Sequence, residues 1–120
     1  MRIVADAQAK QAGIDAAQAA TVLAARASMQ LTRRQVLTGL VLEGLITGPE
    51  ALAPASVPPA AIETLFAAMP DPQQTIARIT WANFTVAYRL DPLIPVIAAA
   101  ATPPLDDAAL DAFFTAYAVV

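Results

Sequence analysis

The chain has 120 residues, a formal net charge of −3 and a sequence pI near 4.6. This length suits one domain whose core needs neither disulfides nor metal, while 58% hydrophobic and 14% charged residues make the chain more apolar than an ordinary soluble domain. The absence of Cys and His excludes disulfides, thiol and imidazole catalysis and the commonest zinc ligands, and the acidic balance argues against a nucleic-acid binder. The few charges leave apolar surface that we expect another chain to cover.

A membrane protein would also be rich in apolar residues, but a spanning helix needs about 20 of them in succession. The longest charge-free run, residues 92–105, is interrupted by prolines. Asp6 and Lys10 stand where a signal peptide would have its apolar region. We therefore expect the chain to stay in the cytoplasm or to enter a particle assembled there.

The first predicted element is a long helix rich in Ala and Gln over Ala5–Ala27. Its larger apolar residues, such as Ile14 and Val22, are too sparse to dock the helix firmly on its own domain. We interpret residues 1–30 as an N-terminal arm that packs on a neighbouring subunit, with a solvent-exposed helix as the alternative, and residues 31–120 as a helical domain.

Three short elements follow the arm. Thr32 with Gln35 forms a capping-box pattern that predicts a helix start, and Thr47 with Glu50 repeats it for a brief helix through about Ala53. The proline-rich stretch at residues 54–59 predicts a stiff loop. Apolar residues spaced for one face of a helix then predict an amphipathic helix at residues 59–69.

The segment Asp71–Leu90 has apolar residues around most of a helix's circumference, so we expect a central helix buried on several sides. Arg78 and Arg89 would lie on a narrow polar ridge of this helix. Asn83 falls inside the apolar arc, where a buried amide would need a backbone or side-chain partner.

Two more helices complete the expected fold. Asp91-Pro92 predicts a helix start for residues 92–101, and Asp106 predicts the start of a last helix in which Asp107 and Asp111 face water. No strand and no repeat is predicted. The expected fold class is all-α: a compact bundle of about five short helices around a central helix at about residues 72–90, with an N-terminal Ala-rich helical arm.

Chemistry-bearing residues are few, and each has a structural alternative. Arg33 and Arg34 at a helix start resemble an anion-binding or DNA-contacting pair, but arginines also lie at the edges of interfaces. Arg78 and Arg89 could hold a carboxylate from another subunit or be solvated. Trp81 is explained by core packing or as an interface anchor. We predict no catalytic, cofactor-binding or metal-binding residue and no enzyme; the candidate interface residues are Ile14, Arg33, Arg34, Arg78, Arg89, Trp81 and Tyr117.

The order of the segments LTRRQVLTGLVLEGLITGPEALA, ARITWANF, RLDPLIPVIAAA and LDDAALDAFF is familiar. It resembles small proteins encoded in the tail and tail-fibre gene region of tailed bacteriophages or prophages of alphaproteobacteria. The likeness runs from about Ser28 to Val120 and, more loosely, through the arm. Many of those proteins carry a His beside the turn at which this chain has Asp91-Pro92.

The resemblance implies a virion structural component that binds other phage tail, baseplate or fibre proteins, or copies of itself, without membrane or cofactor. A first alternative is a tail-fibre assembly chaperone that is absent from the mature particle. A second is a small helical DNA-binding regulator that uses Arg33 and Arg34, and a toxin or antitoxin-like module is a third.

Overall fold

The computed structural model describes the backbone of residues 2–120 and the side chains of residues 15–120. Over these residues the chain is mostly helical, which confirms the all-α class, although two short strands were not expected. The elements are α1 Arg2–Ser28, β1 Gln30–Thr32, α2 Arg33–Leu42, α3 Gly48–Leu52, α4 Ala60–Ala67, α5 Gln73–Asn83, β2 Val86–Tyr88, α6 Leu93–Ala99 and α7 Asp107–Tyr117.

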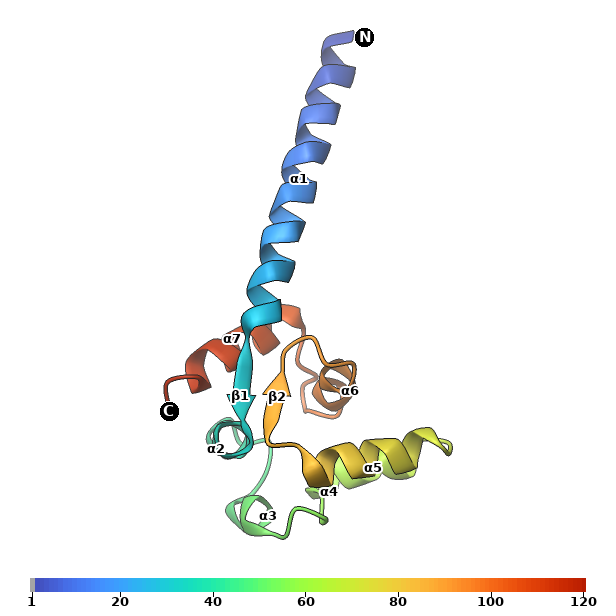
Figure 1. Ribbon diagram of the computed structural model, residues 1–120, viewed down its shortest axis with the longest axis vertical. Helices are drawn as coiled ribbons and strands as arrows, with labels where there is room; N and C mark the ends of the chain where they lie inside the picture. The colour runs from blue at the N-terminus through green and yellow to red at the C-terminus, as the bar shows by residue number, and fades with distance from the viewer. Residues whose placement is uncertain (1) are drawn as a thin grey trace.

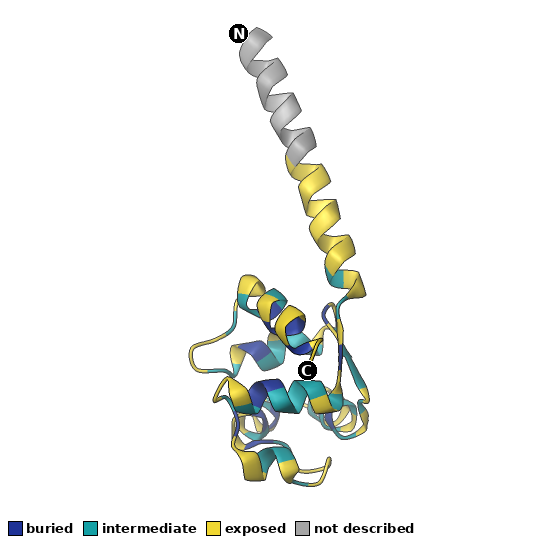
Figure 2. Ribbon diagram, turned by 90° about the vertical axis from the view of Figure 1, so that its left-hand side faces the viewer, coloured by how far each residue is buried: buried dark blue, intermediate teal, exposed yellow. Residues whose placement is uncertain are grey.

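The shape is a helical body from which α1 projects (Figure 1). The principal extents are 62 × 35 × 24 Å and the radius of gyration is 18.1 Å, whereas a compact chain of this length would have a radius of about 14 Å. The difference arises because α1, with 27 residues, is about 40 Å long at 1.5 Å per residue. Of the described side chains of α1, those of residues 15–25 are exposed (Figure 2).

A short antiparallel ladder lies where the arm enters the body. Leu31 of β1 is opposite Ala87 of β2, and the register continues with Gln30 opposite Tyr88 and Thr32 opposite Val86. Leu31 is almost fully buried, with 1% of its surface exposed. The ladder therefore pairs the segment that follows α1 with the segment that follows α5.

Local sequence signals start several helices as expected. The Thr32 hydroxyl accepts from the Gln35 backbone N–H at 3.2 Å while the Gln35 side chain accepts from the Thr32 N–H at 2.9 Å, and Thr47 and Glu50 repeat this capping box. The Asp106 carboxylate accepts from the Ala109 N–H at 2.8 Å. These contacts satisfy backbone donors that have no partner within the helix.

The helix expected over residues 72–90 is shorter and less central than expected. It begins at Gln73 and ends at Asn83. Ala77 and Trp81 are buried, whereas Ile76 and Ile79 are 59% and 57% exposed, so α5 lies at the outside of the body against α4.

The early end of α5 has a physical reason in the ladder. Residues after Phe84 gain backbone partners from β1 and its flanks: the Arg33 N–H donates to the Thr85 carbonyl at 2.9 Å, and the Arg89 N–H donates to the Met29 carbonyl at 3.1 Å. Asn83 is exposed, contrary to the expected burial, although its amide does donate to a backbone carbonyl, that of Ile79 at 2.8 Å.

The core is centred on α2, α7 and the ladder. Its buried residues are Leu31, Leu40, Ile46, Ile62, Phe66, Ala77, Trp81, Phe113, Phe114 and Tyr117. Helices α2 and α7 lie in close contact at Gly39, because a Cβ built there would lie 2.6 Å from Phe113 Cζ and 2.7 Å from Tyr117 Cδ2. A side chain at this position would collide with rings that are themselves packed.

Replacing Gly39 by Ala should therefore destabilise the body by about 1–3 kcal/mol, because the added methyl group overpacks the contact between α2 and α7. Urea denaturation followed by circular dichroism measures this free energy. Gly48→Ala is the matched control, since nothing lies within 4 Å of its Cβ position, and it should change stability by less than about 0.5 kcal/mol. Equal effects of the two variants would contradict the close approach at Gly39.

Candidate functional site

The most distinctive feature of the surface is the arm α1 and its attachment to the body. Among the described side chains of α1, residues 15–25 are all exposed, and Arg26 is the first that is half-buried. Val22 and Leu23 are 44% and 57% exposed. A helix with so little of its surface covered by its own body offers that surface to other molecules.

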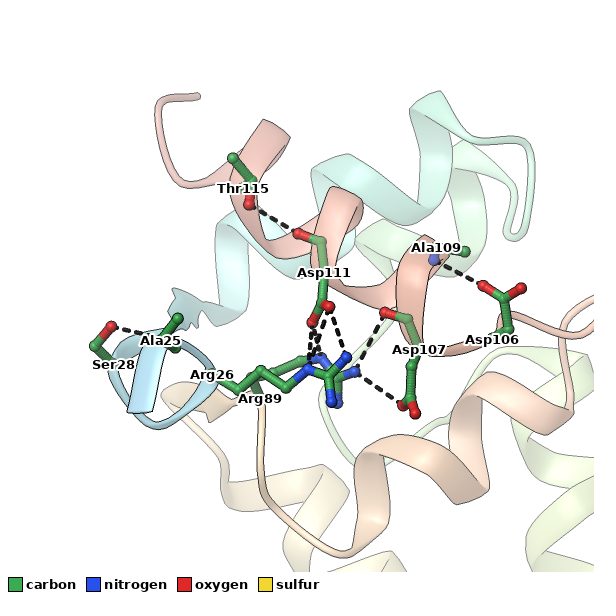
Figure 3. Close-up of polar contacts among 9 residues, drawn as sticks. All are labelled: Ala25, Arg26, Ser28, Arg89, Asp106, Asp107, Ala109, Asp111 and Thr115. Carbon is green, nitrogen blue, oxygen red and sulfur yellow. Dashed lines mark hydrogen bonds and ion pairs between the residues drawn. The ribbon is translucent and has the colours of Figure 1, made fainter. Parts of the chain in front are cut away.

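Arg26 attaches the arm to α7 through a bidentate ion pair with Asp111 (Figure 3). Its Nε donates to Asp111 Oδ1 at 3.0 Å, and its Nη2 donates to Asp111 Oδ2 at 2.8 Å. This geometry fixes orientation as well as position, because the planar guanidinium matches the carboxylate plane. The last turn of α1 is thus held to the body by a directional contact.

Arg89 reaches the same carboxylate from the end of β2 (Figure 3). Its Nε donates to Asp111 Oδ1 at 3.0 Å, and its Nη2 donates to Asp107 Oδ1 at 3.1 Å and to the Asp107 carbonyl at 3.3 Å. Only 4% of Arg89 is exposed. A charge this buried needs its acceptors, so Asp111 is required both for the arm and for the body.

The two arginines lower the pKa of the Asp111 carboxyl below its usual value. The principal cause is the hydrogen bond from Arg26, followed by the opposing effect of burial and by the charges of Arg26 and Arg89. The same hydrogen bond raises the pKa of the Arg26 guanidinium. Asp111 and Arg26 are therefore both charged at neutral pH.

The expectation that Asp107 and Asp111 face water is wrong for Asp111, whose carboxylate is bound by two arginines. Asp107 does remain largely exposed but also pairs with Arg89. Arg89 is buried instead of lying on a polar ridge, because the segment that contains it is not helical and turns it toward α7. No local signal could have shown this, since Arg89 and Asp111 belong to different elements.

Arg78 also has a partner within the chain. It forms a paired contact with Glu63 of α4, with Nη1 to Oε2 at 2.7 Å and Nη2 to Oε1 at 2.8 Å. This hydrogen bond lowers the pKa of the Glu63 carboxyl. Arg78 thus holds Glu63, and Arg89 holds Asp107 and Asp111, all of the same chain. The sequence had left open a carboxylate of another subunit or a solvated face.

Arg33 and Arg34 point to different surroundings. Arg33 donates to the Trp81 carbonyl and lies over the Phe84 ring, with Cζ 4.4 Å from its centroid, and burial lowers the pKa of its guanidinium. Arg34 is exposed and donates to the Val120 carbonyl at 3.1 Å. The structure does not bring the two together as a cationic pair.

The remaining sequence candidates lie in the core or outside the described side chains. Trp81 and Tyr117 are 3% and 9% exposed, and the Tyr117 hydroxyl donates to Glu43 Oε1 at 2.9 Å, which raises the tyrosine's pKa. Ile14 lies on α1 but outside the residues whose side chains are described. Core packing therefore explains Trp81 and Tyr117.

Other apolar side chains are exposed on the body itself. Leu42 and Leu52 are 67% and 88% exposed beside a shallow groove between α2 and α3, and Ile76 and Ile79 are exposed on α5. Within the described residues there is no group of three or more potential metal ligands. No helix in the described part of the chain has the length and apolar character to cross a membrane.

No known family model, curated protein or solved structure matches the chain.

Asp111→Asn should destabilise the protein at pH 7 by about 1–3 kcal/mol, because it removes the charge-assisted acceptor of buried Arg89. Since the folded-state pKa of Asp111 lies below the unfolded value, near 3.9, the stabilisation is present above that value and is lost as the pH falls through the folded-state pKa. Thermal unfolding at several pH values should show wild type and variant converging under acid conditions.

Asp106→Asn is the matched control for this experiment, because the asparagine oxygen can still accept from the Ala109 N–H. It should leave stability at pH 7 almost unchanged. A difference between wild type and Asp111→Asn that is small at pH 7, or that grows on acidification, would refute the assignment.

Proposed function

We propose that the protein is a non-enzymatic assembly component of a bacteriophage tail, located in the tail, baseplate or tail-fibre region of the virion and acting through protein–protein contacts. The observation that carries the proposal is the exposed helical arm held in a fixed direction by the Arg26–Asp111 contact. The phage assignment rests on the resemblance of the segment order. In this role the arm and the body would each make a separate contact with neighbouring proteins.

The arm would bind along or between neighbouring subunits. Half of its residues with described side chains, 15–28, are Ala, and small side chains permit close approach of helix backbones. A helix in water gains little stability without docking, so contact with a neighbouring chain would stabilise α1 itself. The body would supply a second contact through exposed apolar side chains such as Leu42 and Leu52.

The first alternative is a tail-fibre assembly chaperone, which would use the same arm on an unfinished fibre and then leave. Both roles need exposed apolar surface. They differ in whether the protein stays in the finished particle. Mass spectrometry of purified virions separates the two. A structural component should be present in fixed stoichiometry with the tail proteins, whereas a chaperone should be found in infected cells and be absent from the particle.

Association through the arm is tested by replacing Val22 and Leu23 together with Gln, which keeps the helix but removes its larger exposed apolar side chains. Light scattering should show a lower association state, or binding to the tail partner that is at least tenfold weaker. Val57→Gln, in the loop before α4 and 53% exposed, is the control for the loss of one exposed apolar side chain. A solitary wild-type chain that also binds no companion protein from its source would contradict the proposal.

DNA binding stays a prediction that a gel-shift measurement tests. Two observations argue against strong DNA binding. Arg33 already contacts the Trp81 carbonyl and the Phe84 ring, and the net charge of the chain is −3. We expect no shift at low salt, where electrostatic contacts to phosphate are strongest. A shift that Arg34→Ala weakens would instead support the regulator alternative.

A further inference from the structure

The attachment of α1 to the body depends on the side chain of one residue. Among residues 16–28, Arg26 is the residue whose side chain forms a hydrogen bond or an ion pair with the body. The hydroxyls of Thr21 and Ser28 donate instead to carbonyls within α1. Since residues 15–25 are exposed, the ion pair of Arg26 is the directional contact between the arm and the body.

The backbone becomes part of the body at the residue after α1. Met29 is half-buried and packs against the hydrophobic core, and its carbonyl accepts from the Arg89 N–H at 3.1 Å. Ser28, the last residue of α1, is exposed. A change in the direction of α1 therefore requires rotation at the Ser28–Met29 junction and loss of the 3.1 Å hydrogen bond from the Met29 N–H to the Arg26 carbonyl. Hinges commonly consist of a few such residues at the end of an element.

The two arginines that share Asp111 differ in what their departure would leave behind. The side chains of Arg26 and Asp111 are 23% and 28% exposed, so water reaches both. If Arg26 leaves, Asp111 still accepts from Arg89, and Arg89 still donates to Asp107. No buried charge is then left unpaired, whereas the Arg89 side chain, at 5% exposure, would be stranded without its acceptors. Arg26 is therefore the arginine that the cluster can release.

We propose that the Arg26–Asp111 ion pair is a salt-sensitive latch, which fixes the direction of α1 when closed and lets α1 pivot at the Ser28–Met29 junction when open. Partly exposed ion pairs contribute little free energy and are screened by salt, so ionic strength shifts the balance between the two states. The inference goes beyond the proposed function, because it concerns the free chain. The arm can bind a neighbouring subunit whether or not the latch opens, so the two proposals can fail separately.

The chain contains no Cys, so two introduced cysteines can carry nitroxide labels without background labelling. Ala19→Cys on the arm and Ala116→Cys on α7 are both at exposed positions. Double electron–electron resonance, with the labelled full-length chain in excess unlabelled protein, measures the distance between them. The distribution should be narrow at about 0.01 M salt, where the screening length is about 30 Å, and about twice as wide at about 1 M, where it is about 3 Å.

A variant and a matched control assign the effect to the latch. Arg26→Gln in the labelled chain should give the wide distribution at both salt concentrations, because the ion pair is absent. Its melting temperature should stay close to that of wild type, since Arg89 keeps its acceptors. Arg78→Gln removes a comparable paired contact, with Glu63, that lies within the body. This control should keep the narrow distribution at low salt.

Each other outcome overturns the proposal. A narrow distribution in Arg26→Gln, or one in wild type that salt does not widen, would show that another contact fixes the arm. A wide distribution in wild type at low salt would show that the ion pair does not hold α1. A melting temperature of Arg26→Gln as low as that of Asp111→Asn would show that the body needs Arg26, so that the cluster cannot release it.

Discussion

The carboxylate of Asp111 is the contact on which the arrangement of the chain depends. It accepts hydrogen bonds from Arg26 at the end of the arm and from Arg89 after the second strand, so one side chain of α7 joins three segments that are distant in sequence. Because Arg89 is buried, its charge must be matched where it lies. Because Arg26 binds with two nitrogens, the arm leaves the body in a defined direction.

The ladder between β1 and β2 acts together with this contact. Three residues on each side pair at the point where the arm enters the body, and the Arg89 N–H then donates to the Met29 carbonyl. The backbone is thus fixed immediately before and after the residues that form the ion pairs. The result is a small α-helical body from which α1 projects (Figure 1).

Sequence reasoning predicted those features that depend on neighbouring residues. The caps at Thr32, Thr47 and Asp106 were predictable because a hydroxyl or carboxylate three residues before a backbone N–H is a local signal. The all-α class followed from helical periodicity. A long first helix was predicted from its Ala-rich sequence, and its side chains at residues 15–25 are exposed.

Features that depend on distant residues could not be predicted in the same way. Residues 84–90 continue the helical periodicity of α5, but pairing with β1 replaces that helix, and its partner lies more than fifty residues earlier in the sequence. Arg89 then turns from a predicted polar ridge into the body. The same limit applies to Arg78 and Glu63, which belong to different helices.

The central claim is that the arm is an assembly element held by the body and covered only by other chains. Amide hydrogen exchange of residues 15–25, measured in the free chain and in the assembly recovered from its source, tests it most directly. The claim predicts fast exchange in the free chain and strong protection in the assembly, while the amides of α2 and α7 change little. Equal exchange of the arm in both states would contradict it.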